Sequence, residues 1–249
     1  MTLLVPLQPA VIAIDGPGAS GKSTVAFRLA ERIDYLFFDT GVLYRAVTWA
    51  ALERGIAIGD EAAVTELTRT LAIDVAAPSA GSADGRHCTV LVDGRDVTWL
   101  IRTPQVDQHV STVSAYTEVR QILSDQQRRI GARYGGGQGD RAGVVMVGRD
   151  IGTVVMPDAA LKIYMVASAE ERARRRYLEQ TERGRAVSYA EILQDLLRRD
   201  QLDSERAVAP LRPAEDAFVI DTSQLTPDEV VQRIIDLAAK RVAETPALG

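Results

Sequence analysis

The sequence predicts an α/β fold in which helices connect the strands of a mainly parallel sheet. Strand-length apolar runs, helical spacing of apolar residues between them and glycine-rich turns where the two meet all support this fold. The first run, residues 11–14, ends at a glycine loop, and a helix is expected over 23–33. A second strand over 35–38 leads into a helix over 42–54. With 249 residues, 46% of them hydrophobic, the chain is long enough for one large domain or a core with insertions.

The middle of the chain departs from this alternation. Apolar and polar residues alternate around 72–77 and 87–99 between turn signals, which predicts a small antiparallel insertion. Residues 113–133 have helical spacing and predict a helix. The glycines within 135–139 form a loop that is too short to separate two domains.

The alternation of strands and helices returns after residue 140. Further strands are expected at 144–147, 161–166 and 218–220. One helix is expected to begin near residue 170, and a second to cover 189–200. Thr226 and Glu229 have the spacing of a capping box, with a proline at the first helical position, so a C-terminal helix should begin there.

Composition excludes several classes of protein. A single cysteine, Cys88, excludes an internal disulfide framework, and with only His87 and His109 beside it there is no zinc site of the usual spacing. No apolar run reaches the roughly 18 residues of a membrane span, and Met1–Ala10 lacks the early basic residue of a signal peptide. The net charge of −5 gives no support to a broad nucleic-acid surface. We therefore expect a cytoplasmic protein without a membrane or nucleic-acid partner.

The basic residues are unusually biased towards arginine. Only three of the 29 are lysines, Lys22, Lys162 and Lys240, so the other 26 are arginines. Genomic base composition is one explanation. Phosphate binding is the other, because a guanidinium contacts two oxygens of an oxyanion at once. The positions of the arginines distinguish between these two explanations.

Residues 16–21, Gly-Pro-Gly-Ala-Ser-Gly, fit two phosphate-binding patterns. As G-x-G-x-x-G, with Asp39 at the end of the next strand, they indicate a dinucleotide site. Extended to Ser23, they match G-x-x-x-x-G-K-[ST], in which Lys22 reaches the β/γ oxygens of a nucleoside triphosphate and Ser23 joins the Mg²⁺ shell. The second pattern is favoured, because the first gives Lys22 and Ser23 no task. The predicted donor loop comprises Gly16, Pro17, Gly18, Ala19, Ser20, Gly21, Lys22, Ser23 and Thr24.

Charged residues also follow the other predicted core strands. Asp39-Thr-Gly41 follows the second of these strands, and Gly148-Arg149-Asp150 follows the third. Because parallel α/β sheets bind ligands at the carboxyl ends of their strands, both segments should face the glycine loop. A structural ion pair is the alternative for each charged residue taken alone.

The chain resembles the bacterial cytidylate kinases along nearly its whole length. Five segments in order carry this resemblance: Ile12–Thr24, Asp39–Arg45, Ile101–Thr103, Gly148–Val155 and Arg199–Leu211. The resemblance implies a single domain: a parallel-sheet P-loop kinase core with helices on both faces, an enlarged monophosphate-binding insertion and a short helical lid. The core is expected at about 10–60, 141–172 and 190–245, the insertion at about 62–140 and the lid at about 173–189.

The activity implied by the resemblance is transfer of the γ-phosphoryl group of ATP to CMP or dCMP, giving ADP and CDP or dCDP. Transfer is expected to be direct, in line and assisted by Mg²⁺, without a covalent intermediate, because the acceptor phosphate oxygen is already ionised. Catalysis is assigned to Lys22, Arg45, Arg149 and Arg206. Ser23 is the expected protein ligand of Mg²⁺, and Asp15 and Asp39 are candidates for a second. A monomer is expected.

The resemblance also assigns the acceptor site. Ser111, Arg120 and Asp150 match the residues that recognise cytosine. A carboxylate and a hydroxyl accept from its amino group, and a guanidinium donates to N3 and O2. Uracil would leave Asp150 facing a carbonyl, at a cost of about 1–3 kcal/mol. The ribose is assigned to Arg199 and Asp203, the acceptor phosphate to Arg45, Arg149 and Arg206, and Thr40 stands where some members have a serine.

The lid is expected to close over ATP and to exclude water from the reaction. Arg172 and Arg176 are the lid residues expected to contact the ATP phosphates. Another kinase of a small acceptor on the same scaffold, such as an adenylate, uridylate or shikimate kinase, stays an alternative. A nucleotide-dependent switch is a further one, although the chain has neither an apolar run ending in Asp-Glu nor a guanine motif.

Overall fold

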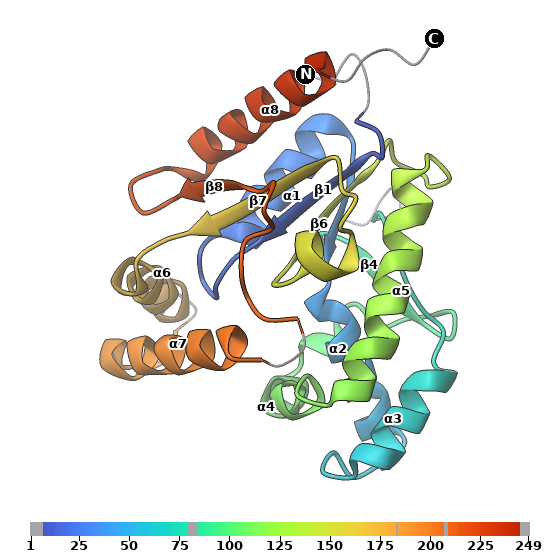
Figure 1. Cartoon of the computed structure of the whole chain (residues 1–249). Helices are drawn as coiled ribbons and strands as arrows, with labels where there is room; N and C mark the ends of the chain where they lie inside the picture. Colours follow the sequence, from blue (N-terminus) through green and yellow to red (C-terminus); the bar gives the residue numbers. More distant parts are fainter. Residues whose placement is uncertain (1–6, 79–83, 183, 207–208, 245–249) are drawn as a thin grey trace.

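A five-stranded parallel sheet forms the centre of the molecule (Figure 1). The computed structural model describes residues 7–78, 84–182, 184–206 and 209–244. The strand order is β2-β6-β1-β7-β8, and every pairing in this sheet is parallel, as predicted. The strands are β1 (Val11–Asp15), β2 (Leu36–Asp39), β6 (Val144–Gly148), β7 (Leu161–Val166) and β8 (Phe218–Asp221).

Helices cover both faces of this sheet, and β1 is buried from both sides. Ile12 and Ile14 pack with α1 (Lys22–Ile33) and α8 (Pro227–Glu244) on one face. Val11 and Ala13 belong to the core on the other face, which includes residues of α2 (Gly41–Glu53) and α5 (Thr117–Gly135). A strand covered on both faces is continuously apolar, which explains why the short runs in the sequence predict these strands well.

The predicted antiparallel insertion is a three-stranded sheet of β3 (Ile73–Ala76), β4 (Thr89–Val92) and β5 (Arg95–Asp96). Two helices in this region, α3 (Glu61–Thr70) and α4 (Pro104–Val113), are absent from the prediction. The expected helix over 113–133 is wrong at its start, because the chain breaks between α4 and α5 at 114–116. The physical reason is that α4 buries only Val106 and Val113, too few residues for a clear helical pattern.

The expected lid corresponds to a pair of packed helices, α6 (Ala169–Glu182) and α7 (Tyr189–Ser204). Figure 1 shows the two lying side by side near the arrowhead of β7. The rings of Tyr177 and Tyr189 join them edge to face, with centroids 6.4 Å apart. The packed pair continues past residue 189 to Ser204.

The C-terminal helix begins as predicted. The backbone N–H and hydroxyl of Thr226 donate to Glu229 Oε2, both at 2.8 Å, and the Glu229 N–H donates to the Thr226 hydroxyl at 3.3 Å. This reciprocal pair is the capping box read from the sequence. Among the described residues, no helix combines the length and apolar character needed to cross a bilayer.

Candidate active site

A cleft of about 1610 Å³ opens at the carboxyl ends of the central strands. The strand register explains its position: Asp15 of β1 is paired with Gly148 of β6, and Asp39 of β2 with Val147, so three strands end at one edge of the sheet. The predicted site residues that line the cleft are Gly18, Ala19, Ser20, Gly21, Lys22, Ser23, Thr24, Thr40, Arg45, Ser111, Arg120, Arg149, Asp150, Arg176, Arg199, Asp203 and Arg206. Gly16, Pro17 and Arg172 do not line it.

The glycine loop joins β1 to α1 and curls around the side chain of Lys22. Gly16 has φ +145°, and a Cβ there would lie 2.1 Å from the Met165 carbonyl oxygen, so only glycine fits at the end of the strand. The Lys22 ammonium donates to the Pro17 carbonyl at 2.6 Å and to the Ser20 hydroxyl at 3.2 Å. Burial, followed by the charge of Arg149, lowers the pKa of Lys22 well below its usual value.

An oxygen pair from the start of α1 and the end of β2 would fit a Mg²⁺ ion. The Ser23 hydroxyl donates to Asp39 Oδ2 at 3.2 Å, which places a hydroxyl and a carboxylate together beside the glycine loop. Mg²⁺ prefers oxygen ligands, few of them from protein and the rest from phosphates and water. Asp15, the other candidate, uses its two carboxylate oxygens to accept the N–H groups of Ile151 and Gly152. The described residues hold no group of three or more His, Cys, Asp or Glu side chains suited to a metal.

Five charged side chains form a second cluster in the cleft, called the acceptor cluster below, and its Arg149 lies beside the glycine loop. The cluster comprises Arg120, Arg149, Asp150, Asp203 and Arg206. Arg120 Nη2 lies 3.2 Å from Asp150 Oδ2, and Arg149 Nε lies 3.0 Å from Asp203 Oδ2. Arg206 pairs with the other oxygen of Asp203. Three cations against two anions leave the cluster with a positive charge for an anionic ligand.

Burial raises the pKa of the Asp150 carboxyl, and the nearby guanidinium groups of Arg120, Arg206 and Arg149 act against that shift. Asp150 thus lies in a partly desolvated place with three guanidinium groups near it. These residues form ion pairs and also line the cleft, so a structural ion pair and a binding site are not exclusive here.

The other predicted acceptor residues lie around this cluster. Arg45 donates to the Ile101 carbonyl at 3.1 Å and pairs with Asp107 at 2.7 Å. Thr40 is buried, and its hydroxyl donates to the Val147 carbonyl at 2.9 Å, so it holds β6 in place. Ser111 of α4 and Arg199 of α7 reach the cleft from the insertion and from the helical pair.

Two further residues that line the cleft, Gln127 and Tyr44, were not predicted from the sequence. Gln127 is only 2% exposed and lines the cleft from α5. Tyr44 also lines it, and the Arg120 guanidinium lies 6.0 Å from its ring centre. Gln127 follows Arg120 by seven residues, two helical turns, so both lie on one face of α5. That spacing is the signal from which Gln127 could have been found.

The two arginines predicted to contact the ATP phosphates lie in different places. Arg172 is only 4% exposed, and it donates to the Gly18 carbonyl at 3.0 Å and pairs with Asp200 at 2.5 Å. It therefore supports the glycine loop from behind instead of lining the cleft. Arg176 does line the cleft, with Glu179 as its partner at 3.3 Å.

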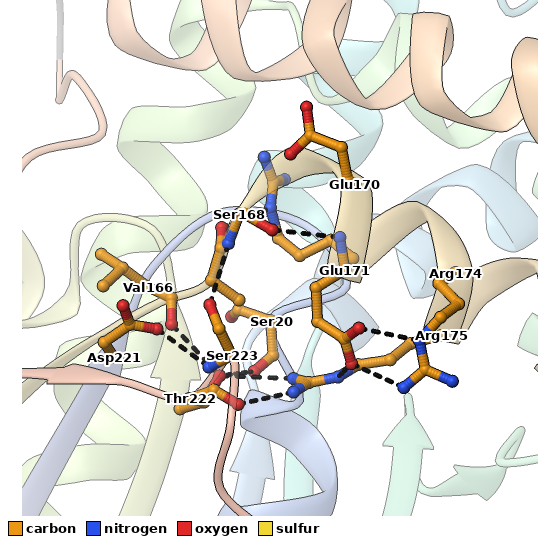
Figure 2. Close-up of polar contacts among 12 residues, drawn as sticks. Ser20, Val166, Ser168, Glu170, Glu171, Arg174, Arg175, Asp221, Thr222 and Ser223 are labelled. Carbon is orange, nitrogen blue, oxygen red and sulfur yellow. Dashed lines mark hydrogen bonds and ion pairs between the residues drawn. The ribbon is translucent and has the colours of Figure 1, made fainter.

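Arg175 of α6, which the sequence did not single out, also lies beside the glycine loop (Figure 2). It donates to Glu171 at 2.8 Å and to the Thr222 carbonyl at 2.5 Å. The Thr222 hydroxyl donates in turn to the Ser20 carbonyl at 3.2 Å. A Cβ on Gly21 would lie 3.7 Å from Arg175 Nη1. Arg175 thus joins α6, the turn after β8 and the donor loop.

Comparison with known proteins agrees with this geometry. The family model described as cytidylate kinase matches residues 12–240. A cytidylate kinase of Herpetosiphon aurantiacus is 49% identical over 92% of this chain and 94% of its own. One of Roseiflexus castenholzii is 48% identical over 94% and 95%, and one of Bacillus licheniformis is 44% identical over 92% and 96%. The chain belongs to the cytidylate kinase family.

Proposed function

We propose that this protein transfers the γ-phosphoryl group of ATP to CMP or dCMP, giving ADP and CDP or dCDP. The observation that carries the proposal is the cleft itself, in which a phosphate-binding loop faces an arginine and aspartate cluster suited to a second, anionic nucleotide. Membership of the cytidylate kinase family names the class of reaction.

On the donor side, the loop amides and the end of α1 bind the phosphates, and the Lys22 ammonium approaches the β/γ oxygens. Lys22 exchanges its contacts with Pro17 and Ser20 for those oxygens, and the anionic phosphates raise its pKa again. Ser23 and Asp39 would hold a Mg²⁺ ion, which would neutralise part of the phosphate charge.

On the acceptor side, Asp150 and Ser111 accept from the cytosine amino group, and Arg120 donates to N3 and O2. Arg199 and Asp203 contact the ribose, and Arg45, Arg149 and Arg206 hold the acceptor phosphate. Concentrating these guanidinium groups offsets the repulsion between two polyanions and stabilises the charge that spreads over the transferred group. The reaction needs no general base, so positioning of the two nucleotides carries the rate.

Measurement of ADP release with CMP, dCMP, UMP, AMP and shikimate as acceptors tests the proposal. Turnover with the cytidine nucleotides should exceed turnover with the other three. Faster turnover with AMP or shikimate would assign the cleft to another kinase of this scaffold. ATP hydrolysis without transfer to any acceptor would favour a nucleotide-dependent switch. Lid closure, the division of the chain into core, insertion and lid, a cytoplasmic location and a monomeric state stay predictions.

A further inference from the structure

Asp15 connects the two halves of the cleft. It is the last residue of β1, directly before the glycine loop, and is only 5% exposed. Its Oδ1 accepts the N–H of Ile151 at 2.9 Å, and its Oδ2 accepts the N–H of Gly152 at 2.7 Å. The strand that carries the donor loop is therefore bonded, through one carboxylate, to the segment that carries Arg149 and Asp150.

The two amides open a single π-helical turn, Ile151–Val155. The first N–H groups of a helical turn have no partner within it, and an anion at this end is favoured. A Cβ on Gly152 would lie 3.5 Å from Asp15 Oδ2, an ordinary contact, so the carboxylate lies directly against the backbone at this residue. Without this acceptor, two buried N–H groups would lose their partners.

We infer that Asp15 is a positioning residue for the acceptor nucleotide. By holding the N–H groups of Ile151 and Gly152, it fixes the backbone directly after Asp150. That backbone sets the direction of the Asp150 carboxylate towards Arg120 and of the Arg149 guanidinium towards Asp203. Asp15 acts through these residues and touches neither nucleotide. The inference rests on the proposed function, since it assigns Asp15 to the acceptor half of that cleft.

The surroundings of Asp15 give this role a pH dependence. Burial raises its pKa to about 6, the charge of Asp150 adds to the rise, and the two N–H donors and Lys22 act against it. From β7, Tyr164 faces the same carboxylate and Lys162 lies beside Gly152. Protonation places a hydroxyl hydrogen against one of the two N–H groups. Acceptor binding should therefore weaken as the pH falls below about 6, while ATP binding changes less.

The test is Asp15→Asn, which keeps the shape and one oxygen but turns an NH₂ group towards the second N–H. The KM for CMP should rise about tenfold or more, and the preference for CMP over UMP should shrink. The KM for ATP should stay within about twofold, because the donor loop keeps its own contacts. The acidic decline in kcat/KM for CMP near the Asp15 pKa should also disappear in the variant.

Asp60→Ala is a matched control for a lost carboxylate contact. Asp60 caps α3, does not line the cleft and accepts the Ala63 N–H at 3.0 Å, so its loss should lower stability without moving either KM. Should Asp15→Asn fail to fold, Asp15→Glu keeps the charge but moves the carboxylate by one methylene group, and a selective rise in the KM for CMP is expected there too.

The inference is overturned if the KM for ATP rises as much as the KM for CMP. It is equally overturned if both KM values, the base preference and the pH profile of Asp15→Asn match the wild type. These outcomes differ from failure of the proposed function, in which the wild-type protein itself would form no CDP.

Discussion

At the scale of single residues, the chemistry depends on charged groups with little water around them. Lys22 is 6% exposed and Asp150 is 9% exposed, and each lies against oppositely charged or polar partners. Electrostatic interactions are stronger in such places than at the surface. The sequence predicted these two residues through motifs. It could not predict the role of Asp15, because the partners of its carboxylate are backbone amides 136 and 137 positions away.

Lys22→Met should nearly abolish transfer and preserve the fold, because methionine fills most of the side-chain volume without its charge. The expected loss in kcat is about 100- to 1,000-fold. Steady-state kinetics and circular dichroism measure the two effects. Lys240→Met, at an exposed position of α8, is the control and should keep wild-type turnover. Wild-type turnover in Lys22→Met would remove the loop lysine from the mechanism.

Asp150→Asn should relax the preference for CMP over UMP, because an amide side chain both donates and accepts. The ratio of kcat/KM values should fall about tenfold. Asp125→Asn, which alters an exposed aspartate of α5 paired with Arg128, should leave the ratio unchanged. An unchanged ratio in Asp150→Asn would show that this carboxylate does not read the base.

The raised pKa of Asp15 also predicts an effect on stability, with the opposite sign to its effect on binding. Its pKa is about 6 in the folded protein against 3.8 as reference, so the folded state holds more protons between these values. This contribution to the free energy of unfolding is complete below the lower value and is lost as the pH rises through the higher one. Urea unfolding at about pH 7 and about pH 5 measures it. Wild type should gain stability relative to Asp15→Asn at the lower pH, and a relative loss would contradict the assignment.

At the scale of elements, the best predicted ones are strands buried on both faces and helices with a cap formed by neighbouring residues. The central strands and the Thr226 capping box belong to this class. The insertion was predicted only in outline, because its short helices bury few residues: α4 buries two. The spacing of the arginines in α6 could not show which of them contacts the turn after β8. Helix α6 carries three arginines in succession, Arg174, Arg175 and Arg176, and only the packing against the turn after β8 distinguishes them.

Arg175→Ala should weaken ATP binding more than CMP binding, because it removes the contact between α6, Thr222 and the donor loop. The KM for ATP should rise about tenfold. Arg185→Ala, in the exposed turn between α6 and α7, serves as the control for loss of a lid cation. An equal rise of both KM values in Arg175→Ala would indicate a general loss of structure instead.

At the scale of the whole molecule, the arginine bias has two explanations that hold in different places. Arg28 and Arg32 both pair with Asp228 on the surface, where lysine would serve as well. In the cleft, Arg120, Arg149 and Arg206 gather around two aspartates, where the planar guanidinium has a geometric advantage. A protein with a net charge of −5 thus concentrates positive charge where two anionic nucleotides would meet.

The central claim is that the cleft selects a cytidine nucleotide as the phosphate acceptor. A mixture of equal amounts of CMP and UMP with ATP and Mg²⁺ tests it most directly, because the ratio of the first-formed CDP and UDP gives the ratio of the two kcat/KM values. The account predicts that CDP forms in clear excess over UDP. Equal amounts of the two products, an excess of UDP, or neither product would contradict it.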